Sequence, residues 1–232
     1  RLAWDFGREA YRNPENPNRP RFGPDSGPNV IPGTYNVVVK YGGHEAKGTL
    51  SVVPDPELKN TQADWQAWDA AAVRTGELQN AVADAANRLA ATRKEVNAAV
   101  AKLEARDKER ERAGGAKGPD DAGKALRQSA RDLQKKISAV ERRLLVSSEQ
   151  KGLIEDPSTV VSQVENARRA VGTSWETPNA SARAYIDQAE AAARPVLADV
   201  NKLYAEDVPA FQKKLADAKV DVLTIPPAIE VK

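Results

Sequence analysis

The chain has 232 residues, with 35 Lys and Arg against 33 Asp and Glu, which leaves a formal net charge of +2. This near balance provides no single-sign field that would hold nucleic acid or an anionic membrane surface, so we expect neither partner. The absence of cysteine and the single histidine exclude disulfides, thiolate metal sites and histidine-cluster metal sites, and we expect no cofactor. No apolar run reaches the roughly eighteen residues that would cross a bilayer. The length and the alanine-rich, aromatic-poor composition favour two small domains.

The N-terminal residues predict a strand followed by an irregular segment. Leu2–Phe6 alternates as a strand does, and Trp4 would be its core anchor. We expect the pairing partner of this strand to precede Arg1 in a longer chain, since nothing before it caps or pairs it. From Gly7 to Pro32 the sequence is rich in proline, glycine and asparagine, which predicts an extended course over a surface.

A β-hairpin is predicted over residues 34–53. Thr34–Tyr41 and His44–Val53 both read as strands, and the Gly42-Gly43 pair between them is a two-residue turn signal, because glycine tolerates positive φ. Two or three strands with exposed edges barely form a domain. We therefore interpret residues 1–56 as part of a truncated β-sandwich that further β-structure must complete.

Helical periodicity begins after Asn60 or Thr61, either of which can cap a helix, and continues to residue 112. At 1.5 Å per residue this helix would be about 75 Å long. Its apolar positions alternate in steps of four and three residues, as a coiled-coil seam requires. They are Leu78, Val82, Ala85, Leu89, Thr92, Val96, Ala99 and Leu103.

Further helices follow a glycine-rich turn at residues 113–119. A second helix over 121–148 would fold back on the first as an antiparallel pair, and shorter helices are predicted over 158–171 and 179–205. Pro195 should kink or break the last of these. The predicted seam positions are Leu126, Ala130, Leu133, Ile137, Val140, Leu144, Ser147, Val160, Val164, Ala167, Val171, Ile186, Ala189, Ala193, Val196, Val200 and Leu203. The expected fold is thus α+β, mostly α, with residues 57–232 forming an elongated antiparallel bundle of three to four coiled-coil-like helices and an extended C-terminal tail.

Few side chains indicate chemistry. His44 falls at the hairpin tip, without the cleft and the supporting group that a catalytic base needs. Asp5, Asp55 and Asp64 belong to a group of carboxylates near the sheet that could act in pairs on a glycoside, but no feature predicts a concave floor or a raised pKa. The run 106–112 alternates basic and acidic residues and is interpreted as a solvated helix end. We assign no catalytic residue.

Three tryptophans are the candidate contact residues. Trp65 and Trp68 are three residues apart and share one helical face where the sheet joins the first helix. They could form an aromatic platform for a sugar or a protein partner, or they could seal the sheet against the helix, which we favour. Trp175 lies in a loop between helices, where it could close one end of the helical part or contact a partner.

Several motifs occur together and in a fixed order. They are Arg1 with Trp4 and Asp5, the proline-rich passage, Pro32-Gly33-Thr34-Tyr35 before the hairpin, Asp55-Pro56 after it, and the later runs EDP, TPNASARAY and DVPAFQKKL. This order resembles the C-terminal part of a family of secreted bacterial proteins that carry a sortilin-like or sialidase-like β-propeller and are often labelled glycosyl hydrolases. Glu57 departs from the arginine that is usual in the family.

The resemblance implies a small Ig-like domain and a helical tail that follow the propeller of a secreted, periplasmic or cell-envelope protein. Residues 1–56 are then expected to be a partial Ig-like domain, and any hydrolase activity is expected to belong to the propeller. The leading hypothesis is a non-catalytic structural module that packs against the propeller and presents a helical surface to a protein partner. One alternative is an accessory carbohydrate-binding part of a glycoside hydrolase, and another is self-association through the alanine-rich seams.

Overall fold

A computed structural model describes residues 3–14, 27–118, 120–145, 156–220 and 226–229. These residues are mostly helical and include one two-stranded antiparallel sheet, so the expected α+β, mostly α class is confirmed. None of the helices in the described part of the chain is both long and apolar enough to cross a bilayer.

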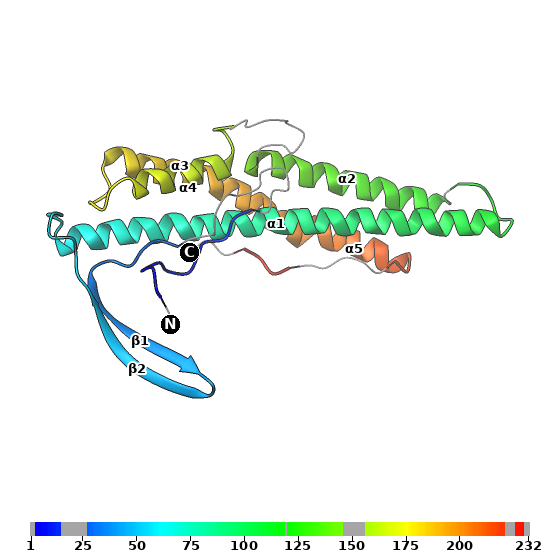
Figure 1. Ribbon diagram of the computed structural model, residues 1–232. Coiled ribbons are helices and arrows are strands. Elements are labelled where there is room, and N and C mark those ends of the chain that lie inside the picture. The colour runs from blue at the N-terminus through cyan, green and yellow to red at the C-terminus, as the bar shows by residue number, and fades with distance from the viewer. Residues whose placement is uncertain (1–2, 15–26, 119, 146–155, 221–225, 230–232) are drawn as a thin grey trace.

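The sheet is a single hairpin of β1 (Gly33–Tyr41) and β2 (His44–Val52), in which Tyr41 pairs with His44 next to the turn. Gly42 and Gly43 have φ values of 55° and 81°, the left-handed pair that a type I′ turn requires. The predicted hairpin and its glycine turn are therefore confirmed. In Figure 1 the hairpin projects away from the helices.

The predicted strand over Leu2–Phe6 is not formed across its described residues. The carboxylate of Asp5 accepts a hydrogen bond from the N–H of Gly7 at 3.0 Å, and Phe6 has a φ of 63°, so the chain turns sharply here. Trp4 is 43% exposed instead of anchoring a core. The prediction was wrong because a short aspartate turn competes with the extended backbone that strand alternation suggests.

The longest helix, α1 (Gln62–Arg112), begins at one of the two predicted caps, Thr61. The Thr61 hydroxyl accepts from the backbone N–H of Asp64 at 3.3 Å, and the Asp64 carboxylate accepts from the N–H of Thr61 at 2.9 Å. This reciprocal capping box satisfies two donors that the first turn leaves without helical partners. The helix then runs unbroken for 51 residues, as its periodicity predicts.

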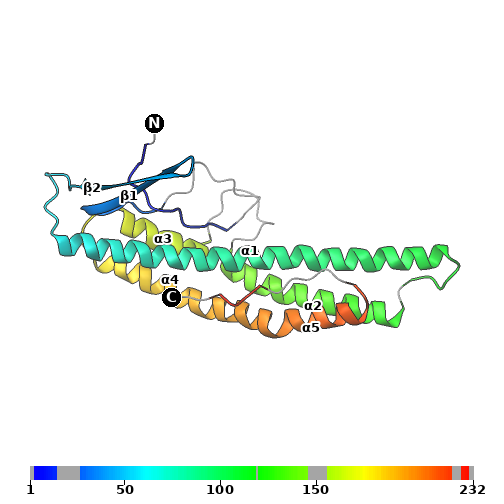
Figure 2. The same cartoon turned by 90° about the horizontal axis from the view of Figure 1, so that it is seen from below.

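The other helices pack along α1. Figures 1 and 2 show α3 (Val160–Gly172) and α4 (Ala180–Lys202) beside the N-terminal half of α1, and α2 (Asp121–Leu144) running back along its C-terminal half. The predicted fold-back of the second helix onto the first is therefore present.

A π-helical stretch, η1 (Leu203–Asp207), joins α4 to the last helix, α5 (Val208–Asp217). The N–H of Val208 donates to the carbonyl of Leu203, one residue further back than in an α-helix. Pro209 follows at once, and in a regular α-helix its ring would meet the carbonyl four residues earlier. The π-helical turn of η1, which is one residue wider than an α-helical turn, lies at the position where that clash would occur. The helix does not break at Pro195, which lies inside α4.

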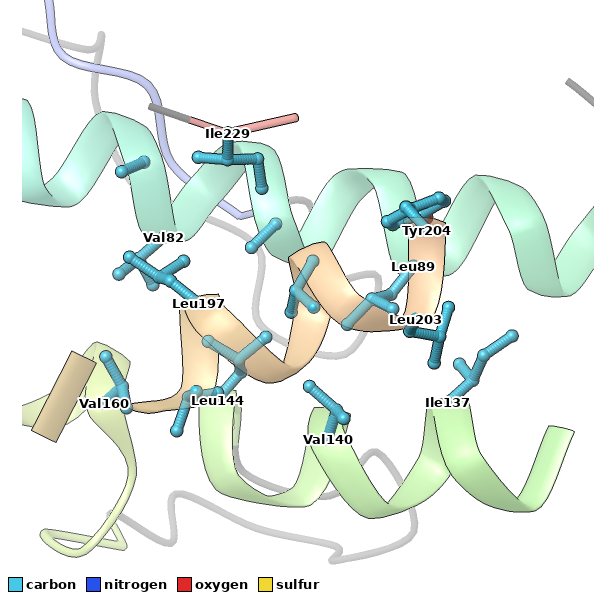
Figure 3. Close-up of a cluster of buried hydrophobic side chains, with 14 of the residues drawn as sticks. Val82, Leu89, Ile137, Val140, Leu144, Val160, Leu197, Leu203, Tyr204 and Ile229 are labelled. Carbon is cyan, nitrogen blue, oxygen red and sulfur yellow. The ribbon is translucent and has the colours of Figure 1, made fainter. Parts of the chain in front are cut away.

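The core consists of the predicted seams. Figure 3 shows side chains from α1, α2, α4 and η1 pointing toward one another, with Leu89 and Ile137 among the fully buried residues. Every predicted seam position that the structure describes is buried, and Ser147 lies outside the described residues. Enclosing each valine, leucine or isoleucine contributes about 1.5–3 kcal/mol. These seams therefore hold the helices together.

Segments near both ends of the described chain pack on the helices, on α1 near the N-terminus and on α4 near the C-terminus. Near the N-terminus, Arg8 pairs with Asp69 at 2.7 Å and Arg12 pairs with Asp84 at the same distance. Near the C-terminus, the side-chain amide of Asn201 accepts from the N–H of Ile229 at 3.0 Å and donates to its carbonyl at 3.1 Å. Ile229 itself is buried.

The ring of Tyr11 explains a glycine in the middle of α1. A Cβ built on Gly76 would lie 2.0 Å from atoms of this ring, so the close approach requires glycine. The guanidinium of Arg168, on α3, lies 5.6 Å from the ring centroid on a cation–π contact. Burial raises the pKa of Tyr11 above its ordinary value. The N-terminal segment is thereby packed on both α1 and α3.

Candidate interaction surface

The hairpin has one apolar and one polar face. Residues that pair directly across an antiparallel hairpin point to the same side, and side chains alternate along each strand. One side, here called the apolar face, carries Tyr35, Val37, Val39, Tyr41, Ala46, Gly48, Leu50 and Val52, with His44 beside the turn at one end. The other side, the polar face, carries Thr34, Asn36, Val38, Lys40, Glu45, Lys47, Thr49 and Ser51. This separation is typical of a sheet that buries one face.

The apolar face is nevertheless open to solvent. Val37, Val39 and Leu50 are 36%, 41% and 39% exposed. Every other residue of the two strands is exposed as well, apart from the half-buried Tyr35 and Val52. An isolated two-stranded hairpin is marginally stable in water, so this hairpin lacks the packing that usually stabilises one.

Aromatic rings cover one end of the apolar face. The Trp4 ring lies 5.2 Å from that of Phe6 and 6.3 Å from that of Tyr35, between ring centroids. Hydrogen bonds fix two of these rings: the Trp4 indole donates to the Gly7 carbonyl at 2.9 Å, and the Tyr35 hydroxyl donates to a nearby backbone carbonyl at 2.6 Å. Trp4 and Phe6 remain nearly half exposed, so these rings do not form a closed core among the described residues.

Charges on the hairpin lie on the polar face. Glu45 forms ion pairs with Lys40 at 3.4 Å and with Lys47 at 3.1 Å. Both lysine side chains stay about three-quarters exposed, and such pairs contribute little to stability. The apolar face therefore carries no Lys, Arg, Asp or Glu side chain, and its imidazole, that of His44, lies beside the turn at one end of the face.

The three candidate tryptophans meet in a single cluster. The ring of Trp175 lies 5.6 Å from Trp65 and 4.4 Å from Trp68, between centroids. Trp65 and Trp68 are 5% and 6% exposed, and Trp175 is half-buried against the helical core. The partner of Trp65 and Trp68 is thus the loop between α3 and α4, and not the sheet that we expected them to seal.

Hydrogen bonds fasten this cluster. The Trp68 indole donates to the Val171 carbonyl at 3.1 Å, and the Thr177 hydroxyl donates to the Asp64 carboxylate at 2.7 Å. Hydrogen bonds from Thr61, and then from Thr177, lower the pKa of Asp64. With their faces packed together, Trp65 and Trp68 form no exposed platform in this structure. A role of the three tryptophans in partner binding stays a prediction.

Titratable groups are scattered. No three His, Asp or Glu side chains come together as metal ligands among the residues that the structure describes. His44 lies at the hairpin turn, as its sequence position indicates. Glu141 on α2 has a raised pKa, because partial burial opposes its charge more than the ion pair with Arg93 favours it.

Comparisons of the chain with protein-family models, with curated proteins and with solved structures find no match. The resemblance to the propeller-containing family stays a prediction, and so does a secreted location. Sequence reasoning located the hairpin and expected further β-structure to complete its sheet. The structure adds that no other strand among the described residues covers the apolar face.

Proposed function

We propose that this chain is a non-catalytic structural and interaction module whose hairpin packs its apolar face against a second β-domain. The observation that carries the proposal is the exposure of Val37, Val39 and Leu50 on one face of the hairpin. Sheets in β-sandwiches cover such a face with another sheet about 10 Å away. Enclosing the roughly two-fifths of each side chain that is still exposed would contribute on the order of 1 kcal/mol each.

The finer architecture follows from the same face. A hairpin with one apolar face and an aromatic cluster at one end, Trp4 with Phe6 and Tyr35, is half of a sandwich core. We propose that it belongs to an Ig-like domain that β-structure outside residues 1–232 completes. The packed helices would then be an elongated antiparallel, coiled-coil-like bundle, and α1, with its 51 residues, would be its longest surface for a partner.

The sequence motifs supply the setting. Their order supports a place after the β-propeller of a secreted or cell-envelope protein, with the completed Ig-like domain packed against that propeller. The prediction is that the coding sequence before Arg1 specifies propeller repeats. A coding sequence without any β-domain before Arg1 would contradict this setting.

A pair of valine substitutions tests the contact. Val39 is on the apolar face and its neighbour Val38 is on the polar face, so Val39→Thr and Val38→Thr make the same chemical change on opposite sides. In the longer natural protein, we expect Val39→Thr to lower the free energy of unfolding by about 1–2 kcal/mol and Val38→Thr to change it by less than about 0.5 kcal/mol. Equal effects of the two substitutions would contradict packing of the apolar face.

The carbohydrate-binding alternative draws less support. It needs an exposed aromatic ring, whereas Trp65 and Trp68 are buried and Trp175 is half-buried against them. Binding of this chain to a glycan panel that Trp175→Ala abolishes, without a change in thermal unfolding, would favour this alternative over the module.

A further inference from the structure

Among the residues that the structure describes, no third strand pairs with either outer edge of the hairpin, so both edges present backbone groups without a ladder partner. The type I′ turn closes with a hydrogen bond between Tyr41 and His44, and hydrogen-bonded pairs alternate with non-hydrogen-bonded pairs from there. Every second residue of β1 therefore directs its N–H and C=O away from β2. These residues are Thr34, Asn36, Val38 and Lys40.

The two edges differ in how well they resist pairing with another strand. On β2 the residues whose backbone N–H and C=O point outward include the charged Glu45 and Lys47, and Gly48 weakens the middle of the strand. Both features oppose pairing with another strand. On β1 three consecutive valines, Val37–Val39, occupy the middle, and the only charge lies near the turn, on Lys40. A strand rich in valine with few charges is the kind of edge that pairs with a like strand.

We propose that the outer edge of β1 pairs antiparallel with β1 of a second copy of this chain. A two-fold axis through Val37 places each Val37 opposite its counterpart, Tyr35 opposite Val39, and Asn36 opposite Val38. Thr34 then lies opposite Lys40, so no two like charges meet. The outward N–H and C=O groups fall in hydrogen-bonded pairs in this register, and both apolar faces lie on the same side of one four-stranded sheet.

This pairing goes beyond the proposed function, because it uses the edge of β1 and the contact with a β-domain uses the face. Either contact can exist without the other. A failure of edge pairing therefore leaves the valine test of the apolar face unaffected.

A single introduced cysteine tests the register, since the chain contains no cysteine. In the paired sheet the two Val37 positions form a non-hydrogen-bonded pair with Cα atoms about 4.5 Å apart, within the range of a disulfide. Ala46→Cys is the matched control, because Ala46 is exposed on the same face but on β2. Its two copies would lie three strand spacings apart across the sheet and four residues apart along it, a separation of roughly 20 Å.

We expect the Val37→Cys chain to form a cross-linked dimer under mild oxidation at least about ten times faster than the Ala46→Cys chain. We also expect the unmodified chain to show twice the mass of one chain at the high end of a sedimentation-equilibrium concentration series. A single-chain mass at every concentration, or equal cross-linking rates, would overturn the pairing.

Proline substitutions separate the two edges. Val38→Pro removes an outward N–H from β1, and Lys47→Pro removes one from β2 at the same rung, since these residues are cross-strand partners. The Val38→Pro chain is expected to sediment as a single chain and the Lys47→Pro chain as a dimer. The same mass for both variants would overturn a specific role of the β1 edge. The comparison of the Val37→Cys and Ala46→Cys chains tests the pairing without proline, so its result holds even if proline destabilises the hairpin.

Discussion

The helices and the hairpin are both amphipathic, yet only the helices bury their apolar side. Leu89, Ile137 and Leu144 are enclosed by side chains from neighbouring helices, whereas Val37 and Val39 are more than a third exposed. Local periodicity therefore identifies which side of an element is apolar, but not what covers it. For the helices the cover lies within the same chain, and for the hairpin we propose that it comes from another domain.

The largest expected effect is in the helical core. Ile137 on α2 is fully buried, so Ile137→Asp would place an unpaired charge among apolar side chains. We expect it to lower the free energy of unfolding by at least about 4 kcal/mol. Ala139→Asp, two residues away and exposed, is the control and should change it by less than about 0.5 kcal/mol. Thermal unfolding followed by circular dichroism measures both, and an unchanged transition in Ile137→Asp would contradict the seam.

The contact between the N-terminal segment and α1 should respond next. Gly76→Ala would place a Cβ inside the ring of Tyr11, and we expect a loss of about 1–3 kcal/mol. In a Tyr11→Ala background the same change should stabilise the protein by about 0.5–1 kcal/mol, because alanine favours a helix over glycine. Urea unfolding of the four variants in the cycle measures this reversal of sign. The same sign in both backgrounds would show that the ring does not restrict position 76.

A smaller effect is expected for the buried hydroxyl pair between α1 and η1. Thr92 and Tyr204 are both buried, and their oxygens lie 2.8 Å apart. Tyr204→Phe leaves the threonine hydroxyl without this partner and should cost about 1–2 kcal/mol. Adding Thr92→Val should recover most of that loss, since both polar partners are then removed. Chemical unfolding of the single and double variants tests this, and additive losses would contradict the coupling.

The pH dependence of stability should carry a contribution from Glu141. Burial raises its folded pKa above 4.5, so in the window just above 4.5 the folded state holds more protons than the unfolded state. Stability then falls as the pH rises through that window. Glu141→Gln should remove this part of the fall, and Arg93 keeps a hydrogen-bond acceptor. Unfolding free energies measured on both sides of pH 4.5 test the sign, and parallel curves for the two proteins would contradict it.

The smallest effect on this chain is expected in the hairpin. Val39→Thr should change the free energy of unfolding of the helices by less than about 0.5 kcal/mol, because Val39 is exposed and lies outside the helical core. Thermal unfolding followed by circular dichroism measures this. A large shift would show that the hairpin packs on the helices. The apolar face of the hairpin would then be covered within this chain, as the apolar sides of the helices are, and the difference between the two regions would disappear.

Sequence reasoning predicted the helices well for reasons that particular residues illustrate. Thr61 with Asp64 is a capping signal that acts within one turn, and the four-three spacing around Leu89 needs only the geometry of a helix. It failed at Trp4, where the turn formed by Asp5 redirects the chain, and at Trp65, whose partner Trp175 lies 110 positions away in sequence and could not be read from local pattern.

By itself, the amino-acid sequence determined the position of the glycine turn of the hairpin, the extent of α1 with its cap narrowed to two neighbouring residues, and the apolar seams of α1, α2, α3 and α4. These properties depend on backbone preferences and on side-chain spacing within a few residues. Only the tertiary structure decided that Tyr11 lies on Gly76, that the three tryptophans share one cluster, and that the apolar face of the hairpin stays open. Such contacts join residues far apart in the chain, and they depend on how whole elements pack.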